Sequence, residues 1–220
     1  MQKGFELLLS YLEQLKPGGL AEAFIIGEKF INNNSVALIL GDNFFYAQSL
    51  TKNLRKNLKL KNGATVYLHP VKNPKLYGIA TIDKNNKIIK LDEKPKSTKS
   101  NLAVTGLYFF DNKVVKFSKK LKPSKRKELE IIDLLKIYNK QKKLKAEFLG
   151  RGGAWLDAGS IDDYYDTTAF VSTIEKRQGF KIACLEEIAL NNNWITKKEI
   201  KNSIKFYGSC EYSEYLKKLI

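Results

Sequence analysis

The sequence has 220 residues, and 43% of them are hydrophobic, which is enough to bury one sizeable core. No apolar run reaches the roughly 18 to 20 residues that a membrane-spanning helix needs, and the N-terminus lacks the pattern of a signal peptide, so we expect a cytoplasmic protein without a membrane partner. Two cysteines and one histidine exclude a disulfide scaffold and any recognisable zinc spacing.

The formal net charge of +16 invites comparison with proteins that bind nucleic acids. Only four of the 39 basic residues are arginine, however, and arginine is the side chain that best reads bases and phosphates. The lysines are scattered along the chain rather than gathered in one stripe. We therefore interpret the charge as a solvated surface and expect no nucleic-acid partner; a nucleic-acid-binding protein would instead show affinity that falls steeply with salt.

The first predicted elements are a helix and a strand. Apolar residues at helical spacing predict a helix over residues 20–31. The short apolar run over residues 36–40 is typical of a buried strand, and it ends in Gly41-Asp42-Asn43, where a loop opens. We therefore expect Asp42 to lie at the C-terminal edge of a sheet.

The remaining elements alternate between the two types. Apolar and β-branched runs predict strands, and apolar residues on neighbouring helical turns predict helices. The predicted strands cover residues 64–69, a hairpin of 78–82 and 87–91, then 103–110 and 146–149; the predicted helices cover 114–121, 128–141 and 161–176. The alternation indicates an α/β fold. We expect a single domain over residues 1–220, with residues 161–220 mostly helical.

Two aspartates, Asp42 and Asp157, each follow apolar residues and lie near a glycine that permits close approach of a ligand. Magnesium is typically held by one or two carboxylates together with substrate phosphates, which suits two single aspartates at separate strand ends. The alternative is that each aspartate caps the helix that follows it.

Several sequence blocks occur in the order and spacing of the glucose-1-phosphate thymidylyltransferases. These blocks are Leu40–Asn43, Asp92–Pro95, Ala103–Tyr108, Glu128–Ile131 and Trp155–Gly159, with further matches at Gly18–Gly27, Arg177–Gly179 and Glu186–Ala189. The chain thus resembles this sugar nucleotidyltransferase family over almost its whole length. The resemblance implies a Rossmann-like mixed sheet flanked by helices, the nucleotide-diphospho-sugar transferase fold, here without its first β-α unit.

The resemblance also implies a reaction. In this family glucose 1-phosphate attacks the α-phosphorus of dTTP to give dTDP-glucose and pyrophosphate, in dTDP-rhamnose biosynthesis. By the same resemblance, Asp42 and Asp157 match the ligands of Mg²⁺, Lys94 matches a lysine on the phosphates, and Glu93 matches a carboxylate that accepts hydrogen bonds from sugar hydroxyls. Positioning and charge neutralisation would supply the catalysis.

Further positions match residues that bind the sugar and the base. Tyr77, Gly78 and Val104 match residues that contact the sugar. Trp155 precedes the second aspartate, and for it substrate binding and core packing are equally good interpretations. Gln14 and Gly19 match residues that read the base. An amide can pair with the imide edge of thymine or of uracil, so the base remains open, as does the sugar epimer.

Tyr46, Glu187 and Ile188 resemble a second nucleotide-sugar site through which the family is inhibited by its end product. The sequence departs from the family pattern here, with Ala47 in place of a glycine and no arginine near Asn191, which argues against feedback inhibition. The family also suggests a homotetramer.

The family's glycine-rich phosphate loop does not precede Gln14, and such loops carry much of the transition-state stabilisation. We therefore expect little or no turnover by this chain alone. Two alternatives follow from that expectation: a non-catalytic module that binds nucleotide sugars, and a truncated paralogue.

Overall fold

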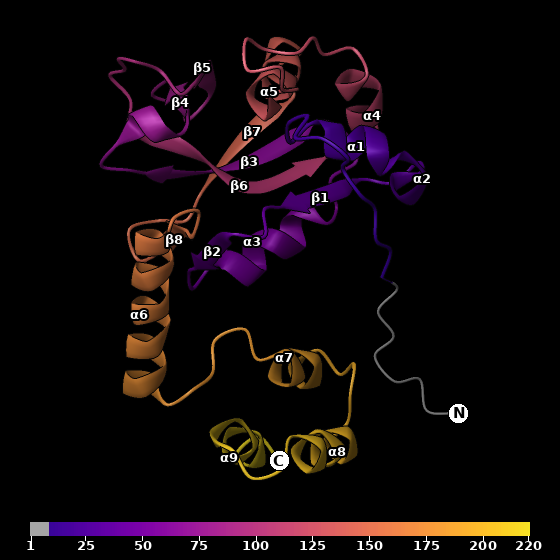
Figure 1. The fold of residues 1–220 in the computed structure, drawn as a ribbon, viewed down its shortest axis with the longest axis vertical. Coiled ribbons are helices and arrows are strands. Elements are labelled where there is room, and N and C mark those ends of the chain that lie inside the picture. Colours follow the sequence, from indigo (N-terminus) through magenta and orange to yellow (C-terminus); the bar gives the residue numbers. More distant parts are fainter. Residues whose placement is uncertain (1–8) are drawn as a thin grey trace. The chain divides into compact units, whose positions relative to one another are not determined.

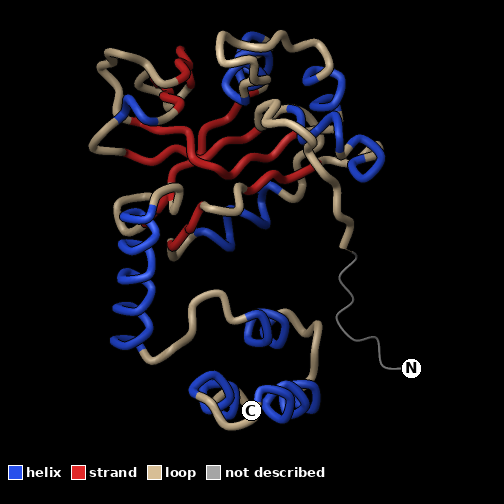
Figure 2. Tube along the Cα trace, viewed as in Figure 1, coloured by secondary structure: helices blue, strands red, loops and turns tan. Residues whose placement is uncertain are grey.

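The computed structural model describes residues 9–220 and divides into two compact units (Figure 1). One unit is Tyr11–Gly159, which contains every strand of the described chain, and the other contains Ser160–Ile220, which is built from helices and loops (Figure 2).

The first unit is organised around a six-stranded mixed sheet. Its order is β5-β4-β6-β3-β7, and β1 also pairs with β6; only β3 and β7 run parallel. The bounds are β1 Val36–Ile39, β3 Ala64–Pro70, β4 Gly78–Ile82, β5 Ile88–Glu93, β6 Leu102–Phe110 and β7 Leu144–Phe148. A separate antiparallel pair joins β2 (Asn43–Tyr46) to β8 (Ala154–Asp157).

Strand β6 is the centre of the core because successive side chains of a strand point to opposite faces. Tyr108 and Phe110 join the larger apolar cluster, and Leu107 and Phe109 join a smaller one. Eight of the nine residues of β6 are buried, as expected of a strand covered on both faces.

Helices and short turns complete the first unit. They are α1 (Glu22–Ile26), α2 (Glu28–Ile31), α3 (Leu50–Asn57), the 3₁₀ turn η1 (Pro74–Leu76), α4 (Lys113–Ser118) and α5 (Ile131–Lys140). Side chains of α1, α4 and α5 pack in the larger cluster, whereas Leu50 and Leu54 of α3 pack against the smaller one. The helices therefore cover both faces of the sheet, which confirms the α/β mixed sheet predicted from the sequence.

Two local predictions were wrong. The single helix over residues 20–31 is interrupted at Gly27, whose φ of −81° and ψ of 10° lie outside the helical region, so α1 and α2 are separate. Strand β1 was expected to be buried, but its residues alternate in exposure and Ile39 is 59% exposed. The reason is that, within the described residues, β1 pairs with β6 alone.

The second unit is helical and has its own core. Its helices are α6 (Ile161–Gln178), α7 (Leu185–Asn191), α8 (Lys197–Tyr207) and α9 (Glu211–Lys217). Ser160 caps α6 and Gly179, at a φ of 73°, ends it, while Thr196 and Glu199 form a capping box on α8. Cys184, Ile200 and Leu216 are buried together. Across residues 9–220, no helix is both long and apolar enough to span a membrane.

The core packing leads to a stability prediction. Leu135 on α5 is fully buried in the larger cluster, so Leu135→Ala should lower the free energy of unfolding by about 2–5 kcal/mol through lost burial and a residual cavity. The neighbouring Lys136 forms only a surface ion pair with Asp133, so Lys136→Ala should cost at most about 1 kcal/mol. Urea denaturation of both variants measures this, and equal losses would contradict the packing.

Candidate active site

The turn between β1 and β2 carries Asp42, and it is tied to two other strands. The backbone N–H of Leu40 donates to the carbonyl of Gly106 on β6 (2.9 Å), and the N–H of Ala158 donates to the carbonyl of Asp42 (2.8 Å). In the β2–β8 ladder, Asn43 lies opposite Asp157. The backbone therefore brings the two predicted aspartates to the same end of one small sheet.

The two carboxylates also converge. A Cβ built on Gly159 would lie 3.2 Å from Oδ1 of Asp157 and 3.9 Å from Oδ2 of Asp42, so both side chains reach the same point. The alternative of helix capping is wrong for both residues. Asp42 is followed by β2, and the helix after Asp157 is capped by Ser160, whose hydroxyl accepts from the N–H of Asp163.

A cavity of about 260 Å³ in the first unit is lined by Asp157, but not by Asp42. Six of the residues predicted from the sequence line it: Tyr77, Gly78, Glu93, Lys94, Val104 and Asp157. The β4–β5 hairpin explains part of this grouping, because Gly78 pairs with Glu93 and the N–H of Lys94 donates to the carbonyl of Tyr77 (3.1 Å). Residues that are distant in the sequence thus share one wall.

Lys94 has an unusual backbone. Its φ is 39°, in the left-handed region that a lysine rarely adopts, and its side chain is exposed at the cavity. Such conformations cost of order 1–3 kcal/mol and persist where the surrounding structure imposes them. The β4–β5 pairing and the bond to Tyr77 impose this one, and the charge of Lys94 acts on the neighbouring Glu93.

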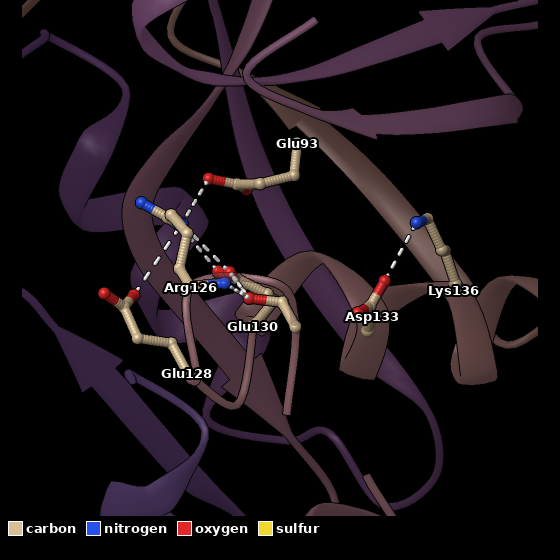
Figure 3. A network of polar contacts seen from close by, with 7 residues as sticks. Glu93, Arg126, Glu128, Glu130, Asp133 and Lys136 are labelled. Atoms are coloured by element: carbon tan, nitrogen blue, oxygen red, sulfur yellow. Dashed lines mark hydrogen bonds and ion pairs between the residues drawn. The ribbon is translucent and has the colours of Figure 1, made fainter. Parts of the chain in front are cut away.

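Arg126 is the main residue of the site to which the sequence analysis gave no role. Its guanidinium contacts three carboxylates: Nη2 lies 3.1 Å from Glu93, 3.6 Å from Glu128 and 2.8 Å from Glu130, and Nε donates to Glu130 at 3.1 Å (Figure 3). All four side chains line the cavity. One feature of the sequence could have indicated Arg126. Arginine is scarce in this chain, and the arginine fork is the side chain that best suits carboxylate and phosphate groups.

The charge balance around Glu93 is unfavourable to its ionised form. Burial raises the pKa of the Glu93 carboxyl, and the nearby Glu130 carboxylate raises it further, while Arg126 and Lys94 oppose the shift without cancelling it. Hydrogen bonding to Glu130 raises the pKa of Arg126. The cavity therefore holds a carboxylate poised to gain hydrogen bonds from a ligand's hydroxyl groups.

The two residues predicted to read the base lie together. Nε2 of Gln14 donates to the carbonyl of Gly19 (3.2 Å) and to Oε2 of Glu22 (2.5 Å). Gly19 has a φ of 94°, and the N–H of Leu129 donates to the carbonyl of the preceding Gly18 (2.7 Å). The turn at Gly19 is therefore pressed against the segment that carries Arg126 and Glu130.

Trp155 does not line the cavity, but it contacts a residue that does. Its ring lies 5.2 Å from that of Tyr77 and 6.4 Å from that of His69, centroid to centroid, and its indole N–H donates to Oδ1 of Asn43 (2.7 Å). Trp155 also packs against the smaller apolar cluster. Trp155 therefore packs in the core, and it also contacts Tyr77, one of the residues predicted to bind the sugar.

The residues expected at a regulatory site are split between the two units. Tyr46 lies on β2 in the first unit, and Glu187 and Ile188 lie on α7 in the second. The Glu187 carboxylate accepts a hydrogen bond from the hydroxyl of Tyr215 (2.6 Å), which raises the pKa of that tyrosine, already raised by burial, to about 12. The regulatory site stays a prediction.

Comparison with known proteins decides the family. Residues 1–174 match the family model described as nucleotidyl transferase, which is most of the chain. The chain belongs to this nucleotidyl transferase family. The resemblance drawn from the sequence blocks is confirmed, and the enzyme class with it.

Individual members of the nucleotidyl transferase family are similar over long stretches. The glucose-1-phosphate thymidylyltransferase of Neisseria gonorrhoeae is 47% identical over 98% of this chain, which spans 75% of that protein. A Bacillus anthracis protein described as a glucose-1-phosphate thymidylyltransferase, crystallised with a sucrose, is 40% identical with a TM-score of 0.64, covering 71% of this chain and 62% of its own. A UDP-glucose pyrophosphorylase crystallised with UDP-glucose is 26% identical, with a TM-score of 0.64, covering 74% of this chain and 66% of its own.

The turn at Gly19 generates a prediction for this member of the family. A side chain there would meet the backbone of Leu129 at 2.5–2.6 Å and would also occupy a left-handed φ, so Gly19→Ala should lower the free energy of unfolding by at least about 1 kcal/mol. Gly152 has open space around it, which makes Gly152→Ala a matched control. Thermal denaturation compares them, and equal melting temperatures would contradict the packing at Leu129.

The raised pKa of Glu93 generates a pH prediction. The folded state holds this proton more tightly than the unfolded chain, so the related stability is fully present below the ordinary pKa of 4.5 and is lost as the pH rises through the higher folded pKa. The free energy of unfolding of the wild type should therefore fall relative to that of Glu93→Gln across this window. Denaturation curves from pH 4 to 7 measure the difference, and a constant difference would refute the assignment.

Proposed function

We propose that this chain serves the reaction of a glucose-1-phosphate thymidylyltransferase, in which dTTP and glucose 1-phosphate give dTDP-glucose and pyrophosphate. The single observation that carries the proposal is the convergence of Asp42 and Asp157 beside a cavity whose other polar side chains include Lys94, Glu93 and Arg126. The similarity to enzymes that bear this name supports it.

The proposed site for the sugar phosphate uses the charged groups of the cavity. Lys94 offers a compact ammonium group for a phosphate. Arg126, whose Nη2 lies 3.1 Å from Glu93, offers a second cation. Glu93 accepts hydrogen bonds from vicinal hydroxyl groups of the sugar. These bonds replace the hydrogen bonds to water that the carboxylate loses because it is partly buried. The lining residues Gly78 and Val104 leave room for main-chain contacts to the sugar.

The aspartate pair suits a divalent cation, and we propose Mg²⁺. Two carboxylate groups of separate strand ends reach one point at Gly159, and hard oxygen ligands are those that Mg²⁺ prefers. The described residues contain no cluster of three or more histidine, cysteine or carboxylate groups arranged for a metal, so water and substrate oxygens would complete the coordination. When bound, the ion would offset the negative charge that accumulates on the phosphates.

The proposed base site is the pair Gln14 and Gly19. The Nε2 group of Gln14 is engaged by Gly19 and Glu22, which orients its Oε1 oxygen as an acceptor. An imide N–H, present in thymine and uracil, is the matching donor. The backbone of Gly19 has no side chain to keep the flat ring away.

The family resemblance adds two further proposals, a homotetramer and a cytoplasmic site of action. Both accompany the proposed reaction and rest on it. Neither alters the assignment of residues within the first unit.

Isothermal calorimetry with dTDP-glucose in the presence of Mg²⁺ tests the proposed function. The wild-type chain should bind, and Lys94→Ala should weaken binding by about tenfold or more because a charge-assisted contact is worth about 1.5–3 kcal/mol. Asp42→Ala should remove the dependence on Mg²⁺. Lys96, exposed on the same loop and outside the cavity, supplies the control Lys96→Ala, which should bind as the wild type does.

Absence of binding by the wild type would overturn the proposal. Equal losses in Lys94→Ala and Lys96→Ala would show that the loop acts only through its general charge. An assay of pyrophosphate release by the same protein preparations, supplied with dTTP, glucose 1-phosphate and Mg²⁺, separates a binding module from a transferase.

A further inference from the structure

The side chain of Asn43, at the start of β2, is bonded to three different parts of the first unit. Its Nδ2 donates to Oδ1 of Asp42 at 2.8 Å. Its Oδ1 accepts from the backbone N–H of Gly106 on β6 at 2.9 Å and from the indole N–H of Trp155 on β8 at 2.7 Å. One amide group therefore links an aspartate of the proposed cation site to two separate strands.

These contacts determine which way the amide points. Gly106 and Trp155 both present N–H groups, so only the oxygen of the amide can face them, and the nitrogen must then face Asp42. The bond to Nδ2 occupies Oδ1 of Asp42, and Oδ2 of Asp42 is the atom that reaches toward Gly159 and Asp157. The amide thus selects the orientation of the carboxylate.

The glycine at position 106 is required for this arrangement. A Cβ on Gly106 would overlap Oδ1 of Asn43, so any other residue there would push the amide away. The same glycine accepts a hydrogen bond from the N–H of Leu40 at the start of the turn. Strand β6, the most buried strand of the sheet, therefore holds both the turn and the Asn43 amide in place through hydrogen bonds to Gly106.

The contact with Trp155 extends the arrangement toward the cavity. Trp155 packs edge-on against Tyr77, which lines the cavity. The Asn43 amide is thus the shared partner of a proposed cation ligand and of the aromatic pair beside the proposed sugar site.

We propose that Asn43 is a positioning residue, which holds the Asp42 carboxylate toward Asp157 and locks Trp155 against Tyr77. This inference rests on the proposed function, because it assigns a cation to the aspartate pair. Groups that orient a metal ligand by hydrogen bonding typically contribute 10- to 100-fold to metal affinity, and we expect an effect of about that size here.

Titration with Mn²⁺ alone, followed by the electron paramagnetic resonance signal of the free ion, tests the proposal. Asn43→Ala should raise the dissociation constant of Mn²⁺ by about 10- to 100-fold. Asn112→Ala is the matched control, since Asn112 makes a single side-chain bond, to the carbonyl of Asn33, away from the cavity lining. It should bind Mn²⁺ as the wild type does.

A second readout follows the hydrogen bond itself. The chain has two tryptophans, so its proton–nitrogen NMR spectrum contains two indole N–H signals, and Trp155→Phe identifies the signal of Trp155. That signal should move in Asn43→Ala and stay in place in Asn112→Ala. If Asn43→Ala does not fold, Asn43→Ser takes its place, because a hydroxyl can still accept from Gly106 but cannot also reach Asp42 and Trp155.

The outcomes separate the two proposals. If the wild type and Asp42→Ala show the same weak Mn²⁺ binding, the proposed cation site is wrong. If Asp42→Ala loses Mn²⁺ while the folded Asn43 variant binds it as the wild type does, the cation site stands and the positioning role of Asn43 is overturned.

Discussion

The antiparallel pairing of β2 with β8 is the constraint on which the candidate site depends. It joins segments that are more than a hundred residues apart in the sequence, and its register places Asn43 opposite Asp157. Since the backbone of Asp42 accepts from Ala158, the pairing continues past the ladder to the aspartates themselves. Carboxylates repel one another, so their convergence needs this backbone support, and a cation between them would offset the repulsion.

The cavity lined by Asp157 also brings several charged side chains close together. Arg126 neutralises part of the charge of Glu93, Glu128 and Glu130, and buried Glu130 depends on it most because an unpaired buried carboxylate is costly. The pKa of Glu93 is nevertheless raised, because burial and the Glu130 carboxylate outweigh the effects of Arg126 and Lys94. A ligand that brings hydroxyl groups to Glu93 would add hydrogen bonds that favour the ionised form of this carboxyl.

Two glycines allow the close contacts that hold the site together. Gly19 lies against the backbone of Leu129, and Gly106 lies against the amide of Asn43. In each case a side chain would overlap a neighbouring polar atom, so the spacing between segments is set by the absence of a Cβ. The turn at Gly19 and the turn that carries Asp42 are thus both fixed to strands and loops that line the cavity.

The sequence by itself determined the α/β class, most strands, the helices α4, α5 and α6 and the family, because alternating apolar patterns and short motifs are local properties. It also indicated Asp42, Asp157, Glu93 and Lys94 by resemblance. Tertiary structure alone decided what depends on contacts between distant segments. The edge position of β1 follows from its pairing with β6 alone among the described strands, and the roles of Arg126 and Asn43 follow from partners contributed by other loops and strands. No local pattern encodes such partners, since hydrogen bonds and ion pairs between segments exist only once the chain has folded.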